Sequence, residues 1–165
     1  MSKNRKFDIV VYGASGFTGK LIVEYLAKEY PSGESGLRWA IAGRNAEKLS
    51  EVHTELELPE TTPILEADST DPQSLKVMAA QTKVVLTAAG PYQLYGSELV
   101  GACAETGTDY VDLCGEPDWI YKMLPAHSEA AKRSGARIVF SCGFDSVPSD
   151  LGVYKLQALA RERFG

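Results

Sequence analysis

The sequence has little cysteine, no long apolar run and no excess of basic residues. Its three cysteines, Cys103, Cys114 and Cys142, form no C-x-x-C pair, and an odd number cannot pair completely within one chain. This usage is typical of a reducing compartment, so we expect the protein to be cytoplasmic. No stretch approaches the roughly 20 apolar residues that cross a bilayer, so we expect no transmembrane segment.

The charge balance is acidic. The chain has 17 basic and 22 acidic side chains and a formal charge of −5, so it lacks the broad basic field that holds a nucleic-acid backbone. Nucleic acid is therefore not an expected partner. Lys3, Arg5 and Lys6 form a small basic N-terminus, which we interpret as a solvated tail. No His, Cys or carboxylate spacing fits a metal site, and none is expected.

Length and hydropathy pattern predict one α/β domain over residues 1–165. With 165 residues, 44% apolar and 24% charged, the composition is that of a globular domain able to bury its own core. Short apolar runs alternate with amphipathic stretches along the chain. The predicted strands are 7–12, 37–42, 63–67, 83–89, 109–113 and 136–142, and the predicted helices are 20–30, 46–56, 72–80, 97–106, 118–134 and 149–163. This alternation predicts a doubly wound, parallel, six-stranded Rossmann sheet of order 3-2-1-4-5-6.

A glycine turn directly follows the first predicted strand. In Gly13-Ala-Ser-Gly-Phe-Thr-Gly19, the first glycine allows a sharp turn and Gly16 lets the backbone approach a pyrophosphate. Gly19 allows the following helix to pack closely, and the helix N-terminus offers free N–H groups to the phosphates. Ser15 and Thr18 can add hydroxyl donors. The turn therefore predicts a dinucleotide site, the alternative being a tight turn without a ligand.

The end of the second predicted strand indicates which dinucleotide binds. An NAD site usually has a carboxylate here, whereas this chain has Arg44, whose guanidinium matches a 2′-phosphate. NADP(H) is therefore favoured over NAD(H). Asp68, after the third strand, can accept from the adenine amine or cap a turn, and both alternatives stay open. The small segment Ala89-Gly90-Pro91 after the fourth strand leaves room for the nicotinamide side of the cofactor.

Together with the glycine turn, four more short segments carry a resemblance to a known family. The five segments are 13–19 (GASGFTG), 42–45 (AGRN), 89–92 (AGPY), 110–116 (YVDLCGE) and 143–152 (GFDSVPSDLG). In this order they resemble the saccharopine dehydrogenase-like oxidoreductases, which include trans-acting enoyl reductases. The resemblance implies that the cofactor contacts the 13–19 turn, Phe17 and Thr18 included, and Arg44. It also implies a second, C-terminal substrate domain, which this chain lacks, so we expect a truncated chain that is inactive by itself.

No residue of the chain is a clear catalytic acid or base. None of the eight tyrosines is followed by Lys four residues later, which excludes the Tyr-Lys pair of short-chain dehydrogenases. Cys142 follows the last strand, but His53 and His127 fall on predicted helices, so we favour a structural role for this thiol over a nucleophilic one. The catalytic residues are unknown, and the proton donor is expected to be water or the missing domain.

Several side chains after the later strands are candidates for the substrate side of the site. They are Tyr92, Glu116 and Asp145, because ligands of open α/β sheets bind beyond the carboxyl ends of the strands. Loop carboxylates that cap the next helix are the alternative, and Asp118 and Asp150 are expected mainly as N-caps.

The sequence supports two hypotheses of different classes. The first is the cofactor domain of an NADP(H)-dependent oxidoreductase acting on a small molecule or lipid of the enoyl, keto or imine type. The second is a non-catalytic module that senses NADP(H) and acts on a protein partner. In either case the apolar excess of the last predicted helix, 149–163, is expected to dock on another domain or on a second copy of the chain.

Overall fold

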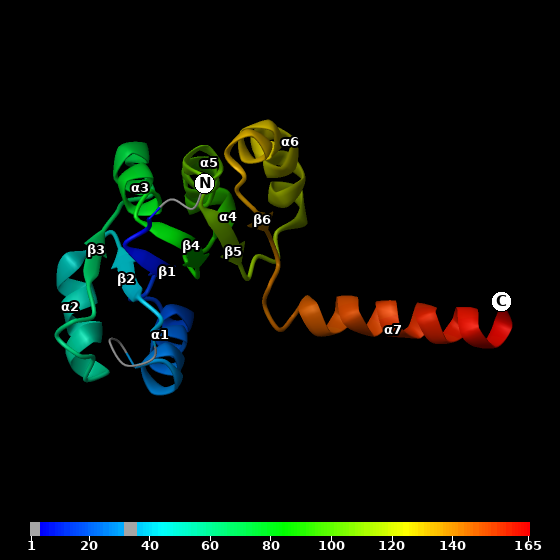
Figure 1. Cartoon of the computed structure of the whole chain (residues 1–165), viewed down its shortest axis with the longest axis horizontal. Coiled ribbons are helices and arrows are strands. Elements are labelled where there is room, and N and C mark those ends of the chain that lie inside the picture. Colours follow the sequence, from blue (N-terminus) through cyan, green and yellow to red (C-terminus); the bar gives the residue numbers. More distant parts are fainter. Residues whose placement is uncertain (1–3, 32–35) are drawn as a thin grey trace.

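The computed structural model describes residues 4–31 and 36–165 and shows one parallel sheet between two layers of helices (Figure 1). The strands are β1 (Phe7–Tyr12), β2 (Trp39–Gly43), β3 (Ile64–Glu66), β4 (Thr82–Thr87), β5 (Asp109–Asp112) and β6 (Ile138–Val139). The helices are α1 (Phe17–Glu29), α2 (Ala46–Glu55), α3 (Pro72–Ala79), α4 (Tyr92–Tyr95), α5 (Ser97–Thr106), α6 (Pro117–Ser134) and α7 (Val147–Phe164). The strand order β3-β2-β1-β4-β5-β6, with every pair parallel, confirms the predicted doubly wound sheet.

Two apolar cores hold the layers together, one on each face of the sheet. On one face, Val11 and Ile41 of the sheet pack with Val23 of α1 and Leu49 of α2. On the other, side chains of β1, β4 and β5 pack against α3, α5 and α6, with Trp119 at the α6 end. The strands are nearly continuous apolar runs because both faces of their central part are covered.

The sixth strand is much shorter than its predicted range of 136–142. β6 pairs only with β5, and its ladder ends after Val139. The next residues leave the ladder because Ser141 has a left-handed backbone (φ +59°) and donates its N–H to the buried carboxylate of Asp112 at 2.7 Å. The sequence pattern also missed α4, a single turn that follows Pro91.

Arg5 corrects the interpretation of the N-terminus as a solvated tail. Its side chain is buried and donates hydrogen bonds to carbonyl groups at the ends of α3 and α5, including Ala80 and, at 2.7 Å, Thr106. These carbonyls carry the negative end of each helix dipole, which explains why a guanidinium is buried there. Lys3 lies outside the described residues.

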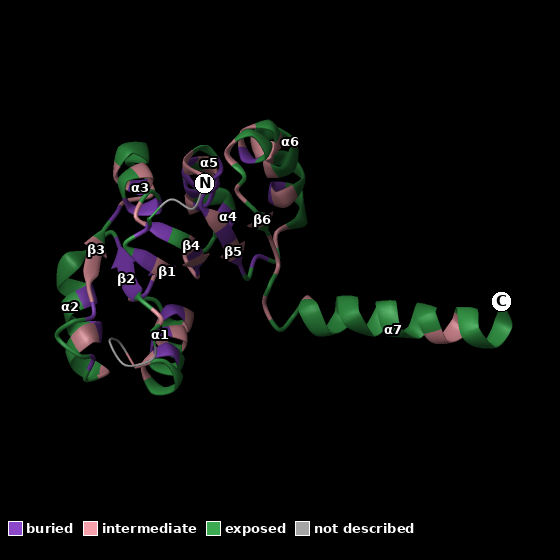
Figure 2. Ribbon diagram, viewed as in Figure 1, coloured by how far each residue is buried: buried purple, intermediate pink, exposed green. Residues whose placement is uncertain are grey.

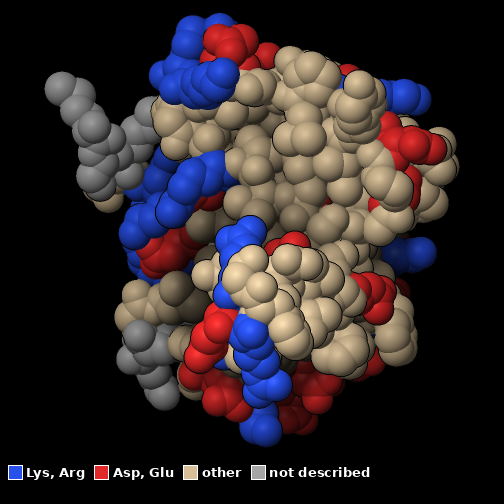
Figure 3. All heavy atoms as spheres, turned by 90° about the vertical axis from the view of Figure 1, so that its right-hand side faces the viewer, with Lys and Arg blue, Asp and Glu red and all other residues tan. Residues whose placement is uncertain are grey.

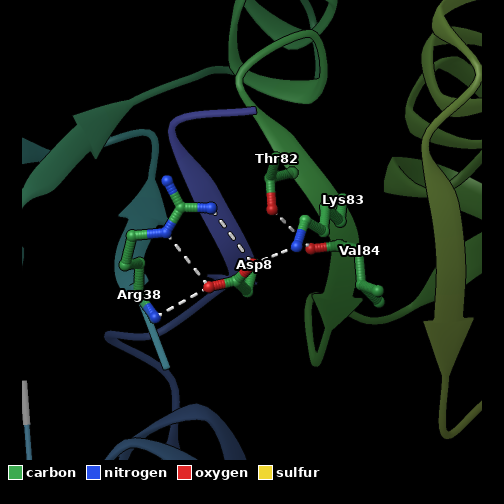
Figure 4. Close-up of polar contacts among 5 residues, drawn as sticks. All are labelled: Asp8, Arg38, Thr82, Lys83 and Val84. Carbon is green, nitrogen blue, oxygen red and sulfur yellow. Dashed lines mark hydrogen bonds and ion pairs between the residues drawn. The ribbon is translucent and has the colours of Figure 1, made fainter. Parts of the chain in front are cut away.

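Asp8 joins three strands at the amino-terminal edge of the sheet (Figure 4). Its carboxylate accepts from the backbone and side chain of Arg38, before β2, and pairs with Lys83 of β4 at 2.6 Å. The hydrogen bonds from Arg38, followed by that from Lys83, hold the pKa of this carboxyl well below its usual value. The stabilisation is therefore complete above the unfolded-state pKa of about 3.9 and is lost as the pH falls below it.

We expect Asp8→Asn to lower the free energy of unfolding at pH 7 by about 1 kcal/mol, because both ion pairs are partly exposed. The loss should shrink as the pH falls below about 4, because the unfolded parent then binds a proton at Asp8 that the folded parent binds only at a lower pH. Urea unfolding at a series of pH values measures both effects. Glu51→Gln, on the exposed face of α2, is the matched control. A variant whose stability tracks the parent at every pH would show that the cluster contributes nothing.

The last helix extends away from the body of the domain, and none of its residues is buried (Figure 2). Its exposed apolar side chains include Leu151, Val153, Tyr154 and Leu156. On the side of the molecule towards which α7 extends, basic and acidic groups surround a broad area with neither (Figure 3). The apolar side chains that the sequence predicted to exceed one packed face of this helix are exposed. The docking of α7 on another domain or on a second copy of the chain stays a prediction.

No helix in the described part of the chain is both long enough and apolar enough to cross a membrane.

Candidate functional site

The glycine turn between β1 and α1 is built as its sequence predicts. Gly13 has a left-handed backbone (φ +83°), and a Cβ there would lie 2.9 Å from the amide nitrogen of Ala89. At Gly19 a Cβ would collide with the carbonyl oxygen of Gly13 and come within 2.8 Å of the Cα of Ala14. Both glycines are therefore required for the turn to close against β4 and α1.

Gly16 differs from its two neighbours because the fold does not require a glycine there. Its backbone is extended (φ −78°, ψ 164°), and a Cβ would meet only the Gly13 carbonyl oxygen, at 3.3 Å. Gly16 is the N-cap of α1, and among the described residues no side chain accepts from the first N–H groups of this helix. A glycine that leaves open space in front of these N–H groups fits a bound pyrophosphate.

A cavity of about 210 Å³ lies beside this turn, at the carboxyl ends of β1, β2 and β4. It is lined by Tyr12, Gly13, Ser15, Gly16, Gly43, Arg44, Ser69, Ala88, Ala89, Gly90 and Tyr95. Six residues predicted from the sequence therefore come together: Gly13, Ser15, Gly16, Arg44, Ala89 and Gly90.

Other predicted cofactor residues lie around the cavity instead of lining it. Phe17 projects into solvent with 84% of its surface exposed, and Gly19 packs against Gly13. Thr18 lines a neighbouring cavity, and Pro91 is the exposed N-cap of α4. Contact of these four with a cofactor stays a prediction.

Arg44 stands at the mouth of the cavity, between the end of β2 and the N-cap of α2. Its side chain is exposed, and its guanidinium carbon lies 6.0 Å from the ring centre of Tyr95. An exposed guanidinium at this position can reach an incoming phosphate.

Asp68 caps a turn, which is one of the two roles left open by the sequence. Its carboxylate accepts from the backbone N–H and the hydroxyl of Thr70, both at 2.8 Å. These hydrogen bonds, assisted by the nearby charge of Arg44, lower the pKa of Asp68. Contact with an adenine stays a prediction.

The lining residues that were not predicted from the sequence include Tyr12, Ser69 and Tyr95. Tyr12 is the last residue of β1, and burial raises the pKa of its hydroxyl, with hydrogen bonding to Ser69 offsetting part of the effect. Tyr12 ends β1 and Ser69 follows β3, and these positions at the carboxyl ends of strands could have identified both residues from the sequence. Nothing in the sequence pattern indicated Tyr95, because α4 was not predicted.

Tyr92 and Glu116 contact each other and do not line the cavity. The Glu116 carboxylate accepts from the backbone N–H groups of Tyr92 and Gln93 at 2.7 and 3.0 Å. Tyr92 is buried, which raises the pKa of its hydroxyl to about 12, and its ring packs 5.7 Å from that of Trp119. In this structure both side chains fix α4 to the end of β5, and their contact with a substrate stays a prediction.

Asp145 is exposed and lines a second, more apolar cavity of about 420 Å³. Thr18, Asp112 and Cys142 also line this cavity. Asp112 is buried, which raises its pKa, and it accepts from the Tyr110 hydroxyl at 2.8 Å and from backbone N–H groups. The cavity therefore adjoins the start of α1 and is a candidate for the substrate side.

The structure corrects two predicted caps. The N-cap positions of α6 and α7 belong to Glu116 and Ser146, so Asp118 and Asp150 lie within the first helical turns. Cys142 is exposed, and partial burial, with the charge of Asp112, raises its pKa, so its thiol is no activated nucleophile. Within residues 4–31 and 36–165, no His, Cys, Asp and Glu side chains gather into a group that could hold a metal ion.

The fold and the β1–α1 turn together define a class: the chain is a dinucleotide-binding Rossmann domain. Residues 9–139 match the family model described as the saccharopine dehydrogenase NADP binding domain. The chain belongs to this family, as its sequence motifs predicted, and NADP(H) is its cofactor.

The chain is similar to longer proteins. It is 50% identical over 153 residues to a trans-acting enoyl reductase of Mycobacterium leprae, covering 92% of this chain and 36% of that protein. It is 46% identical over 153 residues to a lipid droplet localized protein of Caenorhabditis elegans, covering 90% and 35%. Saccharopine dehydrogenase (L-Glu forming) from Saccharomyces cerevisiae has the same fold (TM-score 0.69, 16% identity, 94% and 32% covered). The chain thus spans about a third of the length of each of these proteins.

Proposed function

We propose that the chain is the cofactor-binding domain of an NADP(H)-dependent oxidoreductase that transfers a hydride to or from a small-molecule or lipid substrate. The observation that supports this most directly is the cavity in front of Gly16, with Arg44 at its mouth, in a chain of this family. The names of the enoyl reductase and lipid droplet relatives favour an enoyl or keto lipid over an imine-type substrate.

In this proposal the side chains and backbone of the chain bind and orient the cofactor. The pyrophosphate lies against the N–H groups at the start of α1, and Arg44 pairs with the 2′-phosphate. The small residues Ala89 and Gly90 leave room for the nicotinamide half of the cofactor beyond β4. The bound cofactor supplies or accepts the hydride.

Substrate binding belongs, in the same proposal, to a further C-terminal domain, for which the relatives have the length. Hydride transfer needs the acceptor carbon held close to the nicotinamide in a water-poor pocket. The cavities beside α1 are open, and no tyrosine of the sequence is followed by Lys four residues later to supply a proton. We therefore expect no substrate-dependent oxidation of NADPH by the 165 residues alone. The cytoplasmic localisation of the protein stays a prediction from its cysteine usage.

Arg44→Ala tests the cofactor assignment. We expect it to weaken NADPH binding by about 1–3 kcal/mol, because a charge-assisted pair with the 2′-phosphate is lost, and to change NADH binding little. Titration calorimetry with both cofactors measures the difference. Arg133→Ala, an exposed arginine on α6, is the matched control. Equal affinity of the parent for NADPH and NADH would overturn the assignment of Arg44.

A further inference from the structure

Tyr95 is the aromatic residue that faces Arg44 across the mouth of the cavity. Both side chains line the cavity, and the Arg44 guanidinium carbon lies 6.0 Å from the centre of the Tyr95 ring. This separation is at the outer end of the range over which a cation is attracted to an aromatic face. Tyr95 is half-buried, whereas Arg44 is exposed, so the ring is the more fixed of the two partners.

Arg44 has no other short-range partner in the part of the chain that the structure describes. No hydrogen bond or ion pair of its side chain is found there. The nearby carboxylate of Asp68 attracts Arg44 by its charge, while its Oδ1 accepts from Thr70. A free arginine side chain samples many rotamers, and fixing it on a phosphate costs conformational entropy. A ring that restricts the guanidinium before the cofactor arrives reduces this cost.

The helix that carries Tyr95, α4, is held by contacts at both of its ends. The carboxylate of Glu116 binds the first N–H groups of this short helix, and the Tyr92 ring packs on Trp119. At its other end, Gly96 lies so close to Trp119 that a Cβ would come within 2.6 Å of the indole. The helix is therefore anchored at both ends, and Tyr95 has a defined position between the anchors.

We propose that Tyr95 is a positioning residue that orders Arg44 for the 2′-phosphate and thereby raises the preference for NADPH over NADH. The inference rests on the proposed role of Arg44. It adds that selectivity depends on two elements, the end of β2 and the helix α4, which lie 51 positions apart in the sequence.

The test compares Tyr95→Leu and Tyr95→Phe, each alone and combined with Arg44→Ala, by measuring dissociation constants for NADPH and NADH. Tyr95→Leu is expected to lower the NADPH preference about two- to fivefold, the strength of an exposed cation–aromatic contact. Tyr95→Phe keeps the ring and should keep the preference. In the Arg44→Ala background, Tyr95→Leu should leave the preference unchanged. Leu94→Ala, at a 69% exposed neighbour on α4, is the control for disturbance of the helix.

The outcomes separate this inference from the proposed function. If Arg44→Ala removes the preference and Tyr95→Leu does not, Tyr95 has no positioning role while the role of Arg44 stands. If Tyr95→Leu weakens both cofactors equally, the ring contacts a part common to both, and the inference is wrong. If neither substitution changes the preference, Arg44 does not read the 2′-phosphate and both proposals fail. Circular dichroism shows that each variant is folded.

Discussion

Gly16→Val is expected to abolish NADPH binding while the domain stays folded. Valine tolerates the extended backbone of this position, and its Cβ would meet only one atom, the Gly13 carbonyl oxygen at 3.3 Å. Its branched side chain would nevertheless occupy the space in front of the first N–H groups of α1, where the proposal places the pyrophosphate. We expect the affinity to fall more than about 100-fold, equivalent to about 2.7 kcal/mol.

Calorimetry with NADPH measures this loss, and thermal unfolding followed by circular dichroism verifies the fold. Gly152→Val is the matched control, because Gly152 lies on exposed α7 with no atom near its Cβ position. Unchanged NADPH affinity in Gly16→Val would place the phosphates elsewhere.

Gly19→Ala, in contrast to Gly16→Val, is expected to lower the stability of the domain strongly. The added methyl group would overlap the carbonyl oxygen of Gly13 and crowd the Cα of Ala14, and both are backbone atoms that cannot rotate away. Overpacking usually costs about 1–3 kcal/mol, and a clash with a fixed turn belongs at or above the upper end of that range.

The urea midpoint of Gly19→Ala should therefore fall well below that of the parent. Gly152→Ala controls for the residue change, since an alanine in an exposed helix stabilises by up to about 1 kcal/mol. A midpoint equal to that of the parent would mean that the turn opens at no cost, and the packing role of Gly19 would be refuted.

The sequence predicted the sheet and the turn because both depend on local patterns. The alternation of apolar runs, such as those around Val10 and Val85, with helical segments predicts the doubly wound sheet. The spacing of Gly13, Gly16 and Gly19 predicts the geometry of the β1–α1 turn. The same reasoning identified Arg44, because the end of the second strand has a defined place in this fold.

What the sequence missed depends on contacts between distant residues. Arg5 is a buried helix-capping group because of carbonyls near residues 80 and 106, and nothing in the first six residues indicates this. Glu116 was a candidate for the substrate side or for a helix cap, and the sequence could not show that it binds two backbone N–H groups of α4, 23 and 24 positions away. Tyr95 could not be placed, since the turn that carries it has no hydrophobic period.

The contacts of Arg5 and Asp8 have a consequence for how the chain folds during synthesis. β1 is the third strand of the sheet in space, and its second neighbour, β4, is made only after residue 82. Arg5 can form its side-chain hydrogen bonds only after the carbonyl groups 75 and 101 positions later in the chain have been synthesised. Because such distant contacts close large loops, the amino-terminal half cannot complete its sheet alone. We therefore expect the two βαβαβ halves, despite their separate patterns, to fold in one cooperative step only after the second half, through β6, has been synthesised.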